Sequence, residues 1–296
     1  MITLHHYTQS DQSPTQLINP DDFGAKRWYY DVDEQAQCLI KWDEDAEDGF
    51  CFLNFDKQIL WQLSTPICHG KLDPVHRIVW LVQRDNNEQV TVLVYDYHGT
   101  LKASLVMRDE LYQSHFIITP LPEPMSIALD FGGGQDGSQS YFLQFANDKI
   151  NIIKTLEDDL CLLFTFADDT KAVLLNFYEN MFFVVSYPKL TVLAQFTMPD
   201  EAYFGNLSKI SDRIWLLADE HRYRYFLFDS DSMQLMDEVV VSGHEPAPDT
   251  DGEIVSNISD MYYQDGKMIF SHYEIIGKFP NTQEKYWWGV ADFGIK

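Results

Sequence analysis

Residues 161–198 read CLLFTFADDTKAVLLNFYENMFFVVSYPKLTVLAQFTM and decide the fold. They contain four apolar runs rich in Leu, Val and Phe, separated by short segments with Asp, Asn or Pro. In the last run, Val192, Ala194 and Phe196 recur at every second position, which puts them on one face of an extended strand. Runs of this length and composition are typical of β-strands. The stretch therefore predicts four strands joined by short turns.

A hairpin of two apolar runs around a small or acidic turn residue recurs along the chain. The copies read FLNFDKQILWQL from Phe52, VLVYDYHGTLKASL from Val92, FLQFANDKINIIKTL from Phe142, FFVVSYPKLTVLAQF from Phe182 and FLFDSDSMQLMDEV from Phe226. The turn positions taken as equivalent are Asp56, Asp96, Ala146, Ser186 and Asp229, with gaps of 40, 50, 40 and 43 residues. A sixth copy, WWGVAD, ends at Asp292.

A repeat of about 40 residues with four strands resembles a blade of a β-propeller. The resemblance lies in pattern and period, and it implies one all-β domain over residues 1–296 with six blades. The last blade lacks an outer strand, which Thr3 to Thr8 would supply, so that the N-terminal strand closes the ring. Seven blades and a β-sandwich remain alternatives. Residues 243–253, GHEPAPDTDGE, are interpreted as a loop between blades five and six.

The charge balance narrows the classes of partner. The chain has 21 Lys and Arg against 46 Asp and Glu, a net charge of −25, and it is 45% hydrophobic. Such hydrophobicity argues against disorder, and the missing basic footprint argues against nucleic acid and anionic membranes. The N-terminus has no signal-peptide pattern, so we expect a cytoplasmic protein and a monomer. The four cysteines are expected to be reduced, although Cys38 and Cys51 could face each other across a hairpin.

The blade assignment predicts where the acidic residues gather. In a propeller, loops from the second to the third strand share one face with loops between blades. The carboxylates predicted on this face to bind a partner are Asp43, Glu44, Asp45, Glu47, Asp48, Glu157, Asp158, Asp159, Asp200, Glu201, Asp249, Asp251 and Glu253. The opposite face receives a smaller set. An acidic face would steer a basic partner, but solubility alone also explains acidic runs.

Motifs for chemistry are absent or incomplete. The run FGGGQDG, residues 131–137, lacks the lysine and the following helix of a phosphate loop. The run DTDGE, residues 249–253, lacks the downstream Glu of a calcium loop. The nine histidines are scattered, and no serine or cysteine stands in a nucleophile motif. We therefore predict no catalytic residue, no metal site and no cofactor.

Two functions from different classes fit this sequence. The first is a non-catalytic propeller that binds a basic protein, in its specific form an immunity or inhibitor protein that neutralises a basic toxin or effector. The alternative is a hydrolase or sugar-binding propeller that depends on a divalent cation at its central tunnel.

Overall fold

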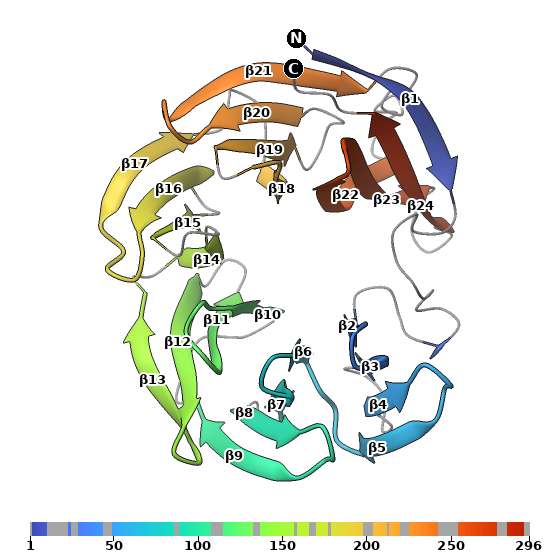
Figure 1. Cartoon of the computed structure of the whole chain (residues 1–296), viewed down its shortest axis with the longest axis vertical. Coiled ribbons are helices and arrows are strands. Elements are labelled where there is room, and N and C mark those ends of the chain that lie inside the picture. Colours follow the sequence, from blue (N-terminus) through green and yellow to red (C-terminus); the bar gives the residue numbers. More distant parts are fainter. Residues whose placement is uncertain are drawn as a thin grey trace. The chain divides into compact units, whose positions relative to one another are not determined.

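The computed structural model describes most of the chain as β-structure. The described residues are 2–10, 23–24, 29–43, 49–85, 89–107, 115–132, 137–156, 159–165, 170–176, 179–197, 204–211, 213–219, 225–241, 254–276 and 283–292. They contain 24 strands, which form five sheets, and no α-helix (Figure 1). The all-β prediction is therefore confirmed.

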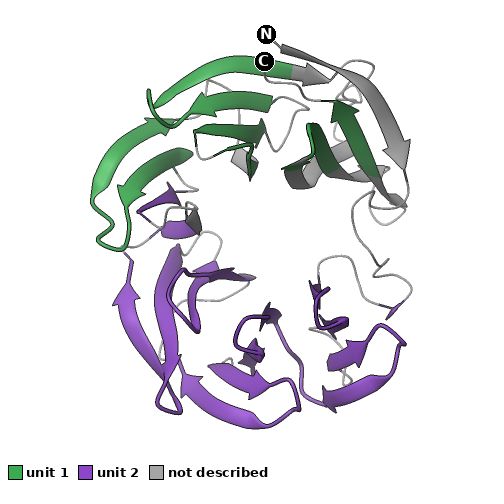
Figure 2. Ribbon diagram, viewed as in Figure 1, with its two compact units in different colours: residues 1–16, 166–168, 177–296 green, residues 17–165, 169–176 purple. Residues whose placement is uncertain are grey.

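The chain divides into two compact units, each described here by itself (Figure 2). Unit 2 comprises residues 17–165 and 169–176, and unit 1 comprises residues 1–16, 166–168 and 177–296. The strands β14 and β15 belong to unit 2, and β16 and β17 belong to unit 1. The prediction of one domain stays a prediction.

Unit 2 contains three complete sheets of four strands, each antiparallel and in chain order. The first has β2 (Tyr30–Asp33), β3 (Cys38–Trp42), β4 (Phe50–Asn54) and β5 (Ile59–Leu63). The second has β6 (His69–Asp73), β7 (Ile78–Arg84), β8 (Val90–Asp96) and β9 (Leu101–Val106). The third has β10 (His115–Pro120), β11 (Ser126–Gly132), β12 (Ser138–Ala146) and β13 (Lys149–Thr155), and β14 (Leu160–Thr165) and β15 (Lys171–Asn176) follow.

Unit 1 contains the remaining strands and the N-terminal strand. They are β16 (Met181–Ser186), β17 (Val192–Thr197), β18 (Phe204–Lys209), β19 (Ile214–Asp219), β20 (Tyr225–Asp229), β21 (Gln234–Val241), β22 (Ile254–Gln264), β23 (Lys267–Ile276), β24 (Gln283–Asp292) and β1 (Ile2–Ser10). The expected pairing of β1 with the last strand is present, and Thr8 lies opposite Val290. The first residues of β1 also pair in parallel with β21, an arrangement that the repeat pattern did not predict.

The middle sheet of unit 2 is covered on both faces. Consecutive residues Ile78 to Val82 of β7 are all buried, as a strand with two covered faces requires. Trp80 and Val82 pack into a cluster with Phe116 and Phe131 of the third sheet. Their neighbours Val79 and Leu81 belong to a second cluster with Phe50 and Phe52 of the first sheet. Alternate residues of one strand thus join two cores.

In the three complete sheets of unit 2, the two turns at one end are tied together. In chain order, the first–second and third–fourth turns lie at what we call the hairpin end, and the second–third and inter-sheet connections lie at the connecting end. Gln37, Arg77 and Met125, each with φ of 53°, close the first turn of three successive sheets. Their carbonyl oxygens accept hydrogen bonds from the main-chain N–H of Phe55, Tyr97 and Phe145 at 3.0, 3.3 and 2.9 Å.

One of the predicted turn equivalences is wrong by two residues. Asp96 accepts the N–H of Thr100 through its side chain, and Asn54, not Asp56, does the same for Gln58, both at 2.9 Å. The Asn54 side chain can replace an Asp because only an acceptor oxygen is needed.

Each outer strand carries a β-bulge at an equivalent place. The cross-strand register between the third and fourth strands shifts by one residue in five sheets. The unmatched residues are Leu60, Lys102, Ile153, Leu193 and Met236. A bulge increases local twist and makes an edge strand a poorer template for edge-to-edge association. This feature accompanies exposed aliphatic side chains such as Ile153, which is 61% exposed.

Gly99 gives a test of the packing between the first two sheets. It has φ of +80°, and a Cβ there would lie 2.8 Å from Cγ of Trp61. Gly266 has a similar φ of +77° but nothing within 4 Å of its Cβ position. We expect Gly266→Ala to cost about 1–2 kcal/mol for the left-handed backbone alone. Gly99→Ala should cost roughly 1–3 kcal/mol more, because the indole ring must move. Urea unfolding measures both, and equal losses would contradict the role of Trp61.

Candidate partner-binding site

The predicted acidic residues belong to connections at the connecting end of their sheets. These connections join β3 to β4, β13 to β14, β17 to β18 and β21 to β22. Of the thirteen residues, the structure describes Asp43 and Asp159. The others lie outside the described residues: Glu44, Asp45, Glu47, Asp48, Glu157, Asp158, Asp200, Glu201, Asp249, Asp251 and Glu253. Described strands on both sides nevertheless place the two ends of each connection.

Asp43 forms the base of the most acidic connection. Its main-chain N–H donates to the carbonyl oxygen of Gly49 at 2.8 Å, which closes the connection where β3 ends and β4 begins. Trp42, the preceding residue, is buried and donates its main-chain N–H to Tyr29 at 2.9 Å. Gly49 is needed because a Cβ there would lie 2.6 Å from the carbonyl oxygen of Thr65. The two ends of this connection, at Asp43 and Gly49, are therefore fixed.

Asp159 is used by the fold. Its Oδ1 accepts the main-chain N–H of Ser138 at 3.0 Å, and its own N–H donates to the carbonyl oxygen of Ser138 at 3.0 Å. Leu156 donates its N–H to Ser140 at 2.9 Å and accepts from Nε2 of Gln139 at 2.7 Å. The connection that carries Glu157 and Asp158 is thus held at both ends by the first residues of β12.

Carboxylates at the hairpin end stabilise turns and neighbouring sheets. Asp33, 4% exposed, accepts the N–H of Ala36 and the hydroxyl of Tyr97, each at 2.9 Å. Burial, followed by the hydrogen bond to Asp33, raises the pKa of Tyr97 well above its ordinary value. Asp31 accepts from Nζ of Lys71 at 2.9 Å and from the N–H of Leu72 at 2.8 Å. These bonds join β2 to the second sheet.

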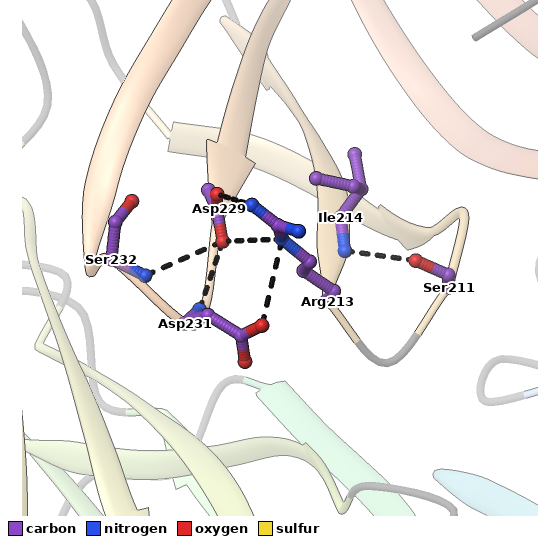
Figure 3. Close-up of polar contacts among 6 residues, drawn as sticks. All are labelled: Ser211, Arg213, Ile214, Asp229, Asp231 and Ser232. Atoms are coloured by element: carbon purple, nitrogen blue, oxygen red, sulfur yellow. Dashed lines mark hydrogen bonds and ion pairs between the residues drawn. The ribbon is translucent and has the colours of Figure 1, made fainter. Parts of the chain in front are cut away.

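The same use of carboxylates occurs in unit 1 (Figure 3). Arg213 binds Asp229 through two N–H groups, Nε at 3.1 Å and Nη2 at 2.7 Å. Asp229 also accepts the main-chain N–H of Asp231 at 2.9 Å, and Asp231 lies 3.5 Å from Nε of Arg213. The hydrogen bond from the Arg213 guanidinium holds the pKa of Asp229 well below its usual range. The carboxylate is therefore part of the turn.

Two polar residues with structural roles escaped the sequence analysis. No sequence pattern pointed to Arg213, because its partner Asp229 lies at the end of another strand, β20. Asp130 stands in the apolar run IALDF, where a charged residue is unusual, and this interruption was the available signal. It is 6% exposed, and burial raises its pKa to about 7, with the hydrogen bond from the Leu162 N–H opposing the shift.

The cysteines and the search for other site types give few candidates. Cys38, Cys51, Cys68 and Cys161 are all buried free thiols, so the alternative of a disulfide between Cys38 and Cys51 is wrong. Burial, followed by the negative charge of Asp33, raises the pKa of Cys38 to about 12. Among the described residues, no group of three His, Cys, Asp or Glu side chains is arranged to hold a metal. In the same part of the chain, no helix has the length and apolar character to span a membrane.

Tyr97 and Tyr95 of the second sheet form a matched pair for testing the hairpin end. Tyr97→Phe should lower the free energy of unfolding by about 1–3 kcal/mol, because a hydrogen bond to the buried Asp33 is lost. Tyr95, two residues earlier, has no hydroxyl partner among the described residues, and Tyr95→Phe should change stability by less than about 0.5 kcal/mol. Denaturant unfolding measures both variants. A stable Tyr97→Phe protein would contradict the role of this contact.

Comparison with known proteins identifies the fold but no family. No family model matches the chain, and no curated protein matches its sequence. A chain of a mitotic checkpoint complex gives a TM-score of 0.57 at 9% identity, covering 97% of this chain and 82% of its own. A luciferin-regenerating enzyme gives 0.56 at 10% identity, covering 98% of both chains. The WD40 domain of SCAP from fission yeast gives 0.51 at 10% identity, and the match covers 88% of this chain and 65% of that one. These similarities show an all-β propeller with about five to six four-stranded blades.

Proposed function

We propose that the chain is a non-catalytic propeller that binds a basic protein through the acidic connections at the connecting end. The observation that carries the proposal is the density of carboxylates in the connection between β3 and β4. Asp31, Asp33, Asp96 and Asp229 at the hairpin end each accept main-chain hydrogen bonds that fix turns or strands. The connection after Asp43 carries four more carboxylates within residues 44–48, more than a turn of this length needs for capping.

The structural neighbours support binding of protein over other functions. Two of the similar structures are WD40 domains, and another belongs to a mitotic checkpoint complex, which is an assembly of proteins. Their low identity carries the fold alone, so the partner must be argued from charge. In its specific form the proposal is an immunity or inhibitor protein that neutralises a basic toxin or effector in the cytoplasm as a monomer.

The proposed ring has six blades. Five follow from the complete repeats, and β22, β23 and β24 with β1 as the outer strand would make the sixth. The antiparallel pairing of β1 with β24 supports this arrangement. Closure by the N-terminal strand would give every blade two covered faces and leave few sheet edges in water.

The physical mechanism is electrostatic steering followed by docking. A net charge of −25 attracts a cationic protein from a distance, and carboxylates on one set of loops would orient it. Salt weakens this attraction, because the Debye length falls to about 8 Å at physiological ionic strength. Contacts at close range must then supply most of the affinity.

The first experiment captures the partner from native lysate at low and at high salt. We expect one stoichiometric basic protein whose yield falls as salt rises. A chain that captures no protein, but whose melting temperature rises with calcium and falls again on chelation, would overturn the proposal in favour of a cation-dependent enzyme or sugar-binding propeller.

The second experiment compares two variants of equal charge with the captured partner. One carries Glu44→Lys, Asp45→Lys and Glu47→Lys at the connecting end. The control carries Glu34→Lys, Asp56→Lys and Asp292→Lys, three exposed positions at hairpin ends. Each set of three reversals changes the net charge by six, from −25 to −19. We expect the association rate to fall on the order of tenfold in the first variant and much less in the control.

Stopped-flow or surface-plasmon kinetics at several salt concentrations measure the association rates. Equal losses in both variants would show that the partner responds to total charge, and would contradict a site at the connecting end.

A further inference from the structure

Asp130 lies at the centre of a polar cluster inside unit 2. It is the fifth residue of β11 and lies directly opposite Ser140 of β12. Both side chains are buried, with exposures of 6% and 0%. Ser140 contacts Oδ1 of Asp130 and the carbonyl oxygen of Leu160 in β14, the latter at 2.7 Å. The N–H of Leu162, also in β14, donates to the Asp130 carboxyl group.

Counting protons in this cluster supports a neutral Asp130. The Ser140 hydroxyl carries one proton but contacts two oxygen atoms. The carbonyl oxygen of Leu160 can only accept, so the hydroxyl proton lies on that contact. The other contact then needs its proton from the carboxyl group of Asp130. The connected arrangement is Asp130 O–H to Ser140 Oγ, and Ser140 O–H to Leu160 O, with Asp130 neutral.

Ionisation of Asp130 would reverse the central hydrogen bond. A carboxylate has no proton to donate, so the Ser140 hydroxyl must turn and donate to Asp130. The carbonyl oxygen of Leu160 then loses its bond to Ser140. In addition, an uncompensated charge would stand among apolar side chains, which is costly.

The lost bond matters because it joins the third sheet to β14. Thr119 of β10 makes a second such contact, from Oγ1 to the carbonyl oxygen of Leu162 at 3.3 Å. Ser140 also accepts the N–H of Leu156 through its carbonyl oxygen at 2.9 Å. Leu156 and Leu160, on either side of the acidic connection, are therefore both bonded to Ser140 of β12.

We propose that Asp130 acts as a proton-dependent clasp, which holds β14 against β12 when Asp130 is protonated and loosens β14 when Asp130 is ionised. The proposal stands whether or not the acidic connection binds a partner. It describes a pH-sensitive element within the fold, set by a hydrogen-bond relay through Ser140.

Among the described residues, four other titratable groups lie on the strands and connections around the cluster. Cys161 of β14 has a thiol pKa raised by burial first and by the charge of Asp130 second, so it stays neutral. Tyr141, next to Ser140 on β12, contacts Phe131 on the opposite face of the sheet. Asp159 is bonded to Ser138, and His115 of β10 pairs with Gly132, two positions from Asp130.

The sign of the pH effect follows from the raised pKa of Asp130. Its value is about 7 in the folded protein against 3.8 ordinarily. Between these values the opened chain releases the proton and the closed chain keeps it, so opening becomes more favourable as pH rises. Above about 7 both states are ionised and the effect levels off.

The test follows the Asp130 carboxyl carbon by NMR and the exchange of β14 amides in the full chain, from about pH 5.5 upward. We expect the carboxyl group to titrate near neutrality. The protection factor of the Leu162 amide should fall about tenfold per pH unit up to that midpoint and then level off. A carboxyl group that titrates near its ordinary value would overturn the proposal without any variant.

Asp130→Asn is the matched variant, because its amide can donate to Ser140 and its oxygen can accept from Leu162, as the protonated acid does. We expect its β14 protection to show no pH-dependent step beyond intrinsic exchange. His115→Gln is the control for the neighbouring imidazole and should keep the step. A step that persists in Asp130→Asn, or that disappears in His115→Gln, would contradict the assignment to Asp130.

Discussion

The packing of unit 2 depends on covering both faces of its middle sheet with the sheets that precede and follow it. In the second sheet of unit 2, Trp80 and Val82 enter one core and Val79 and Leu81 enter the other. A strand that serves two cores must be apolar at every position, which explains the continuous run IVWLV. In β7 the polar residues are therefore confined to the end of the strand, at Gln83 and Arg84.

This constraint explains why the carboxylates lie mostly in the turns and connections. Turns at the hairpin end are short, and their orphan N–H groups need acceptors, which Asp33, Asp96 and Asp229 supply. Once used in this way, a carboxylate is fixed to its own turn. The connections at the other end are closed at their bases by main-chain bonds such as Asp43 N–H to Gly49. The role proposed for the acidic residues between those bases is to bind a partner.

The repeat could be predicted from sequence because burial on both faces makes the strands continuous in composition. Residues 161–198 showed the four-strand unit, and its recurrence predicted the other sheets. Asp56 was wrongly aligned with Asp96 because both are aspartates. The side-chain oxygen that accepts the turn N–H in the first sheet belongs to Asn54. The parallel pairing of β1 with β21 could not be predicted, since it depends on two edges meeting in space. For eleven of the thirteen predicted acidic residues, the assignment to the site rests on the sequence.

Asp130 is a polar residue in β11, a middle strand in which six of the seven residues are buried. A buried carboxyl group is tolerated there because it is neutral and because Ser140 and the Leu162 amide satisfy it. An Asn at this position would satisfy the same partners at every pH, and an apolar residue would leave Ser140 with one contact fewer. The aspartate differs from both in a single property, its ability to lose a proton near neutrality. The same side chain that completes the junction with β14 therefore also makes that junction sensitive to pH.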